Sequence, residues 1–256
     1  LTRREVPMRL RSLLIVVFSA SAFAQWSDLK TPGIPRMPNG KVNLTAPAPR
    51  TADGKPDLNG VWEHPFVPDM TKDDVNQKGE PQLPFTQWGA NEWKTYDAAN
   101  GDYTGACLPF GLTRSINSPY PIQIVQTPQQ IVVLYEYMNV FRVIYMNAKH
   151  RDDVDSTYMG DSVAHWEGDT LVVDVTQLNP QTWLDASGNH FSADAHLVER
   201  FTRTGADTLQ YEATYDDSKT YTRPWTMRVT LHRRTEPNVR VLEYDCNAYM
   251  EFEGGK

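Results

Sequence analysis

Histidines and aspartates recur together in the second half of the chain, within residues 145–161, 174–196 and 216–223. A carboxylate beside an imidazole orients the ring and tunes a pKa that already lies near neutrality, so such a pair can exchange protons with a substrate. The sequence therefore predicts a His/Asp acid–base site. The candidate catalytic residues are His190, Asp185, His196, Asp174 and Asp161.

Aromatic and polar residues from the same stretches are candidates for holding a substrate. They are Trp183, His150, Tyr145, Tyr221, Trp225 and Arg223. A plainer interpretation stays open, because loop carboxylates in an acidic protein are mostly solvated and a strand histidine often only satisfies a hydrogen bond.

Cofactor patterns are weak in this sequence. His190 and His196 could bind a divalent metal, but His-x5-His is not an established ligand spacing. The nucleophile elbow G-x-S-x-G, the P-loop and G-x-G-x-x-G after a strand are absent from the sequence. We therefore expect no nucleotide cofactor and no α/β-hydrolase fold.

Short runs rich in Val, Ile, Tyr, Thr and Leu must position these side chains. Apolar residues alternate within them, as in Leu209, Tyr211, Ala213 and Tyr215, and turn residues separate them. Ten such strands predict an all-β antiparallel meander that closes into a barrel or a strongly curled sheet, since closure removes exposed edges. The runs are 57–63, 121–126, 130–137, 140–147, 161–167, 170–176, 195–203, 207–215, 225–232 and 240–247.

The links between these runs differ in length. If successive strands are antiparallel neighbours, successive links fall at alternating ends of the barrel. One end then carries the links 138–139, 168–169, 204–206 and 233–239, most of them tight. The other end carries the long links 148–160, 177–194 and 216–224. Binding sites lie at such elaborated mouths, so we expect the His/Asp site there.

The first residues predict export. A basic stretch at Met8–Arg11 and an apolar run at Leu13–Phe18 precede Ala22-Phe23-Ala24, the pattern of a cleavable signal peptide. We place cleavage after Ala24, with residues 1–7 upstream of a start at Met8. The apolar run is shorter than the roughly 20 residues that span a bilayer. A secreted or periplasmic protein is expected, with no membrane span after cleavage.

Beyond residue 24, the sequence divides into two parts. Residues 25–56 are rich in proline and form an extended tail, whereas residues 57–256 form a single barrel domain with an irregular stretch at 64–120. A helix over 87–99 is the one regular element expected in that stretch.

Charge and cysteine content narrow the partners. Residues 1–24 hold four arginines and one glutamate, so their removal takes the net charge from −7 to −10. An acidic protein without basic clusters is a poor nucleic-acid binder. In an exported protein Cys107 and Cys246 predict a disulfide, although free thiols or metal ligation are alternatives.

Two stretches resemble phrases shared by a broad set of uncharacterised exported bacterial proteins. They are Thr51–Trp62, which ends in DLNGVW, and Met159–Asp174, which contains WEGDTLVVD. A tryptophan in an early strand followed by a meander is also similar, more loosely, to lipocalin-like barrels. That class includes small-molecule carriers and some lyases, isomerases and hydratases, so the resemblance implies a fold but no particular reaction.

Three functions are consistent with these patterns. The first is an exported barrel enzyme, a lyase, isomerase or hydrolase that acts on a small organic molecule by His/Asp acid–base chemistry. The second is a non-catalytic carrier of an apolar or aromatic ligand, which predicts an apolar lumen. The third is a carbohydrate or surface interaction module, which predicts exposed tryptophans and no deep pocket.

Overall fold

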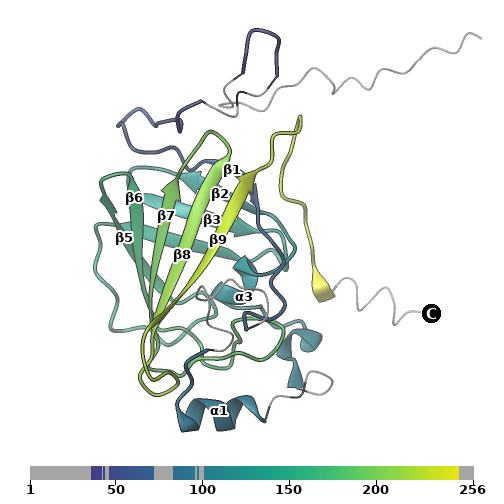
Figure 1. The fold of residues 1–256 in the computed structure, drawn as a ribbon, viewed down its shortest axis with the longest axis vertical. Helices are drawn as coiled ribbons and strands as arrows, with labels where there is room; N and C mark the ends of the chain where they lie inside the picture. Colours follow the sequence, from purple (N-terminus) through teal and green to yellow (C-terminus); the bar gives the residue numbers. More distant parts are fainter. Residues whose placement is uncertain are drawn as a thin grey trace, which may run out of the picture.

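The computed structural model describes residues 36–41, 43, 46–71, 83–95, 97 and 101–247. Nine strands form a closed barrel (Figure 1), which confirms the all-β barrel predicted from the sequence. The predicted signal peptide, residues 1–24, lies outside the described residues. The strands are β1 (Gly60–Glu63), β2 (Ile122–Gln126), β3 (Gln130–Tyr135), β4 (Phe141–Met146), β5 (Asp161–Glu167), β6 (Thr170–Thr176), β7 (His196–Arg203), β8 (Thr208–Asp216) and β9 (Trp225–Arg233).

Alternate side chains of each strand point into the lumen and toward the outside. In β8, the residues Leu209, Tyr211, Ala213 and Tyr215 are buried, while the residues between them are partly exposed. This alternation follows from the pleat of an extended backbone, in which successive side chains point to opposite faces. The apolar residues that the sequence grouped on one face of this strand therefore point into the lumen.

Closure depends on β1, which pairs with β2 on one side and β9 on the other. Its Trp62 is fully buried, and the indole Nε1 donates a hydrogen bond to the Leu58 carbonyl at 2.9 Å. The Arg203 guanidinium lies over the same ring, 5.3 Å from its centroid. A buried indole stabilised by a cation on its face fixes the short β1 strand against the ends of its neighbours.

One pair of neighbours departs from the predicted meander. β4 and β5 run parallel, and they pair only at Tyr145 with Val163 and at Met146 with Ala164. The connection 147–160 must therefore cross from one end of the barrel to the other. The prediction that the 138–139 turn shares an end with 168–169 is wrong for this reason, because the parallel pair reverses the alternation of links.

The barrel has two unlike ends. We call the end with the short links 127–129, 168–169 and 204–207 the hairpin end, which lies at the top of Figure 1. The other, the loop end, carries the links 177–195 and 217–224, and α1 and α3 lie there. The two long links predicted to share one mouth therefore do so. The long link 148–160 was also expected there, but it crosses between the ends.

α1 (Gln87–Trp93) packs on the 217–224 link at the loop end. The Thr86 side chain caps it by accepting a hydrogen bond from the Gly89 backbone N–H at 3.0 Å. A Cβ at Gly89 would lie 2.4 Å from the Thr220 carbonyl oxygen, so only glycine permits this approach. The helix predicted over 87–99 is shorter in the structure, since its C-cap is Lys94.

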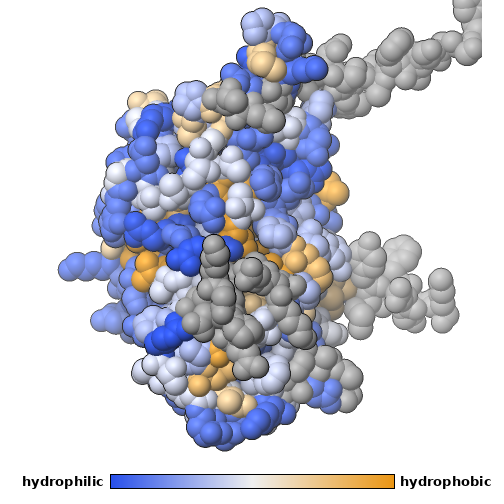
Figure 2. Space-filling view, viewed as in Figure 1, coloured by the Kyte–Doolittle hydropathy of each residue, from blue (hydrophilic) through white to orange (hydrophobic). Residues whose placement is uncertain are grey.

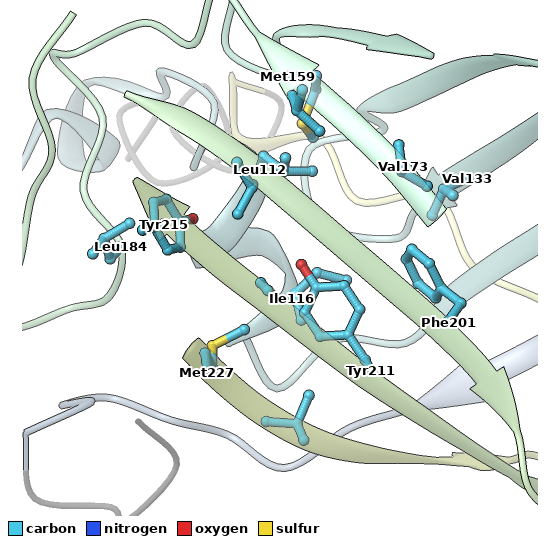
Figure 3. Close-up of a cluster of buried hydrophobic side chains, with 14 of the residues drawn as sticks. Leu112, Ile116, Val133, Met159, Val173, Leu184, Phe201, Tyr211, Tyr215 and Met227 are labelled. Atoms are coloured by element: carbon cyan, nitrogen blue, oxygen red, sulfur yellow. The ribbon is translucent and has the colours of Figure 1, made fainter. Parts of the chain in front are cut away.

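α3 (Leu112–Ile116) occupies the lumen from the loop end, although the sequence analysis predicted an irregular chain there. All five of its residues are buried. Figure 3 shows Leu112 and Ile116 directed toward Tyr211 and Tyr215 of β8 and Met227 of β9, within one core cluster. Fully burying one such aliphatic side chain contributes about 1.5–3 kcal/mol. The lumen is therefore packed with side chains from the strands and from this helix.

An ion pair lies within this core. The guanidinium of Arg142 binds the carboxylate of Glu199, with Nη1 3.0 Å from Oε1, and the two side chains are 1% and 0% exposed. Arg142 Nε donates to Ser162 Oγ at 2.9 Å, and the Tyr211 hydroxyl donates to Glu199 Oε1 at 2.8 Å. The lumen is thus partly charged, unlike the apolar lumen that the carrier hypothesis predicts.

The outer wall is mainly polar on the face formed by β5 to β9. Figure 2 shows hydrophilic residues over most of the upper part of this face. Thr214 and Thr226 share a hydrogen bond of 2.9 Å across β8 and β9, and Arg228 pairs with Glu212 at 2.6 Å beside them. Cross-strand polar pairs of this kind each contribute a few tenths of a kcal/mol to about 1 kcal/mol.

The C-terminal run 240–247 is not the tenth strand that the sequence predicted. It contacts the turn after β3 through an isolated bridge between Tyr244 and Tyr137, and the Leu242 backbone N–H donates to Glu136 Oε2 at 2.9 Å. The predicted disulfide is confirmed: Cys246 is bonded to Cys107, which follows the short helix η1 (Tyr103–Ala106). No helix in the described part of the chain is long and apolar enough to cross a membrane.

Candidate ligand pocket and histidine–aspartate network

Four of the predicted site residues form a continuous chain of hydrogen bonds on the outer wall. His196 Nε2 lies 2.9 Å from Asp174 Oδ2, and Asp174 Oδ1 lies 2.7 Å from His150 Nε2. His150 Nδ1 lies 2.6 Å from Asp161 Oδ2. The two aspartates and His196 project from β5, β6 and β7, whereas His150 belongs to the crossing connection 147–160. The network therefore fastens that connection to the wall.

The two ring nitrogens of His150 both face carboxylate oxygens, which suits a doubly protonated imidazolium. Burial opposes the charged form, but the hydrogen bonds to Asp161 and Asp174 outweigh it and raise the pKa of His150. Burial likewise opposes ionisation of Asp174, yet its hydrogen bonds to His150 and His196 lower its pKa. His150 and Asp174 thus stabilise each other's charged forms.

A groove of about 360 Å³ lies beside the network, between the crossing connection and the wall. Tyr145 and Asp161 line it together with Arg151 and Gln177. Arg151 is already paired with Asp153 at 2.9 Å, and Gln177 donates to the Arg151 carbonyl at 2.7 Å. Because these polar groups bind one another, we interpret the network as a structural fastening rather than a reactive centre.

Replacing His150 with Gln should destabilise the fold in a pH-dependent way. A group whose pKa is raised on folding stabilises the protein fully below its unfolded-state pKa of about 6.5, and that contribution is lost as pH rises through the folded-state value. We expect His150→Gln to lower the free energy of unfolding by about 1 kcal/mol near pH 6. The difference should shrink as pH is raised further, as measured by urea unfolding across pH.

His165→Gln is the matched control for that measurement. His165 also projects from the outer wall and pairs with Glu167 at 3.2 Å, but both side chains are about half exposed. Its replacement should change stability by only a few tenths of a kcal/mol. An equal effect of the two substitutions at every pH would show that His150 is not a fastening charge.

A separate pocket lies at the loop end, outside the lumen. Its volume is about 360 Å³, within the range of small-molecule sites. The predicted residues His190 and Trp183 both line it, and they form an isolated antiparallel bridge with each other. The described residues that line it are Glu92, Thr95, Asp97, Gly101, Pro180, Gln181, Trp183, Gly188 and His190.

His190 is held by aromatic rings on the side of α1. Its imidazole stacks on Phe85 at 5.7 Å between centroids and meets the edge of Trp88 at 6.0 Å. Within the described residues, its Nε2 is buried and has no hydrogen-bond partner. Burial lowers the pKa of His190, although the Gly188 carbonyl partly offsets this effect. The ring is therefore neutral at neutral pH, with one nitrogen able to accept a proton or a hydrogen bond.

Asp185 positions the turn that carries His190. Its carboxylate is fully buried and accepts hydrogen bonds from the Met70 N–H at 2.8 Å, the Ser187 N–H at 2.9 Å and the Asn189 side chain at 2.6 Å. Burial raises the pKa of Asp185 to about 6. Asp185 is not part of the pocket wall. The predicted grouping of His190, Asp185 and His196 is thus not assembled, because His196 lies in the outer-wall network.

The remaining predicted binding residues support the pocket from behind or lie apart from it. Tyr221 is buried, and its hydroxyl donates to the His190 carbonyl oxygen. Trp225 is buried in the core and stacks on Tyr215 at 5.0 Å. Arg223 is exposed on the 217–224 link.

Sequence reasoning did not select several residues of the pocket wall. Glu92 lies in the last turn of α1, and Gln181 and Pro180 precede Trp183 in the longest link. The length of that link was the available signal, because loops of that length are often functional. No group of three or more His, Cys, Asp or Glu side chains in the described ranges is arranged to hold a metal ion.

Comparison with protein-family models and with curated proteins found no match for this chain. The resemblance to exported bacterial proteins and to lipocalin-like barrels in general therefore stays a prediction at the level of family. The assignment of a function rests on the geometry of the pocket and the chemistry of its wall.

Proposed function

We propose that this chain is an exported barrel enzyme that binds a small polar organic molecule at the loop end and acts on it through His190. The observation that carries the proposal is a single group: an imidazole in the wall of a pocket, with a buried Nε2 that no described residue satisfies. Buried polar atoms in proteins are nearly always hydrogen-bonded, so an unsatisfied one in a residue that lines a pocket points to a functional role, in which the ring turns its Nε2 toward the ligand.

The chemistry proposed is general base catalysis. Because burial lowers the pKa of His190, the imidazole is unprotonated at neutral pH and can take a proton from a bound substrate. Stacking on Phe85 and the hydrogen bond from Tyr221 to the His190 carbonyl fix the residue in place. A lyase, isomerase or hydrolase reaction is consistent with one base and polar neighbours such as Gln181.

Two other functions are less well supported. A lipocalin-like carrier needs room in its lumen, whereas here α3 and the buried Arg142–Glu199 pair occupy it. One observation supports a surface interaction module: Trp88 and Trp93 of α1 are 36% and 41% exposed. Both tryptophans also take part in local contacts, because Lys219 lies over Trp88 and the Trp93 Nε1 donates to the Ser187 carbonyl.

Export is part of the same proposal. The disulfide between Cys107 and Cys246 supports it, because such bonds persist in oxidising compartments. The signal-peptide pattern in residues 8–24 supports it from the sequence.

Replacing His190 with Gln should abolish turnover while leaving the fold intact. Gln preserves hydrogen bonding at this position but cannot accept a proton at neutral pH. We would screen the protein by thermal shift with amines, hydroxy acids, sugars and phenols, and follow any conversion of the stabilising compounds by proton NMR. The rate with His190→Gln should fall by about 10²- to 10⁴-fold.

The control is His165→Gln on the outer wall, which should convert substrate at the wild-type rate. If His190→Gln still converted the substrate, His190 would not be the catalytic base. If compounds bound but none was converted, the protein would be a binding module and not an enzyme.

A further inference from the structure

The charges around the pocket are of one sign. Glu92 and Asp97 both line it, and among the residues that the structure describes no lysine or arginine does. Lys94 lines a different pocket, beside Trp93 and Leu83. A concave site walled by carboxylates carries a negative potential, which low-dielectric walls strengthen and which attracts cations.

Glu92 has a carboxylate available to a ligand. No ion pair joins it to any Lys, Arg or His among the residues that the structure describes. Arg114, which lies over the ring of Trp183, is paired with Asp102 at 2.7 Å. Within the described part of the chain, the negative charge of Glu92 is therefore not cancelled by an ion pair.

Trp183 provides an aromatic wall that suits a cation. The Arg114 guanidinium lies 5.5 Å from the centre of its ring, and the Tyr103 ring meets it edge to face, with 5.3 Å between the ring centroids. The electron-rich face of an indole attracts cations within about 6 Å of the ring. This indole thus already contacts one protein cation while it borders the pocket.

His190 adds a hydrogen-bond acceptor without adding positive charge. Burial lowers the pKa of this imidazole, so the ring does not repel a cation at neutral pH. Its Nε2 is buried without a partner among the described residues, so a donor from the ligand satisfies it when the ring turns toward the pocket. A carboxylate, an aromatic ring and a neutral acceptor around one pocket are the groups that bind an ammonium ion.

We propose that the pocket recognises an organic cation, a primary or secondary ammonium group on a small carbon skeleton. The ammonium donates a hydrogen bond to His190 Nε2 and pairs with Glu92, and the carbon skeleton packs against Trp183 and Pro180. This inference rests on the proposed function, because it assigns the substrate class of the same pocket.

Three probes with one skeleton test the proposal: benzylamine, benzyl alcohol and benzoate, which are positive, neutral and negative at neutral pH. Binding to the full mature chain is measured by calorimetry and by tryptophan fluorescence. Benzylamine should bind about tenfold more tightly than either of the others, and added salt should weaken it. Glu92→Gln should weaken benzylamine about fivefold, the effect of one partly solvated charge pair.

Glu212→Gln is the matched control, because it removes the same charge from the outer wall of β8, where Glu212 pairs with Arg228. It should leave benzylamine binding unchanged. Equal effects of Glu92→Gln and Glu212→Gln, or no binding of benzylamine, would overturn the cation proposal. Binding of benzyl alcohol or benzoate that depends on His190 would overturn it while leaving the proposed function in place.

Discussion

Replacing Glu199 with Gln is expected to lower the free energy of unfolding by about 3–5 kcal/mol. The substitution keeps the shape of the side chain but leaves the charge of Arg142 uncompensated in the core, where both side chains are almost completely buried. The Tyr211 hydroxyl also loses a charged acceptor. Urea unfolding at neutral pH, followed by tryptophan fluorescence, measures the loss.

Two further variants separate the cost of a lone buried charge from the value of the pair. Glu212→Gln breaks a partly exposed ion pair on the outer wall and should cost less than about 1 kcal/mol. The double substitution Arg142→Met with Glu199→Leu removes both charges and should recover most of the lost stability. A loss below about 1 kcal/mol for Glu199→Gln would mean that the core tolerates the unpaired arginine.

Removing the disulfide should produce the second large effect. The bond between Cys107 and Cys246 joins residues 139 apart in the sequence, and so restricts a large part of the unfolded chain. Chain-entropy estimates for a loop of this length approach about 5 kcal/mol, and measured losses are typically about 2–5 kcal/mol. The double variant Cys107→Ala/Cys246→Ala should therefore unfold at a markedly lower urea concentration than the wild type.

Reductant provides the internal control for that experiment. Treatment of the wild type should reproduce the stability of the double variant, whereas treatment of the variant should change nothing. Local packing limits the loss of stability, because Tyr244 still contacts Tyr137 without the bond, at 4.9 Å between ring centroids. If full reduction of the disulfide left the stability of the wild type unchanged, the prediction would be contradicted.

The barrel strands could be predicted because their signal is local. Alternation of apolar residues places Leu209, Tyr211 and Ala213 on one face whatever the rest of the chain does, and β5 and β6 begin and end at the predicted residues. The run 240–247 has the same composition, but β9 already pairs with β1, so no edge is left for it. Strand propensity therefore identified one segment too many.

The contents of the lumen could not be predicted from the same pattern. The two-residue alternation of a strand places Arg142 and Glu199 each on one face of its strand, but it does not tell which face points into the lumen. Only closure of the barrel brings these two side chains from β4 and β7 together. The role of α3 is equally non-local, because Leu112 and Ile116 lie in a short segment whose apolar residues gain a core only from the surrounding strands.

For the candidate site, the residue types were predicted better than their grouping. The sequence selected His190 and Trp183, which share one pocket, and also His150, Asp161, Asp174 and His196, which form one network. It grouped His190 with Asp185 and His196 because loops were assumed to converge at one mouth. They are separate because His196 bonds to Asp174 on the outer wall, whereas Asp185 is buried and is not part of the pocket wall.

The parallel pairing of β4 and β5 follows from the odd number of strands in the barrel. Around a closed ring, antiparallel neighbours alternate in direction, so an odd number of strands cannot alternate completely, and this ring has nine. At least one seam must join strands of the same sense, and the chain must then travel the height of the cylinder on its exterior to begin the next strand. The return path here is the segment that carries His150. An even-numbered ring would need no such return, and the aspartates on its wall would face water without a histidine between them.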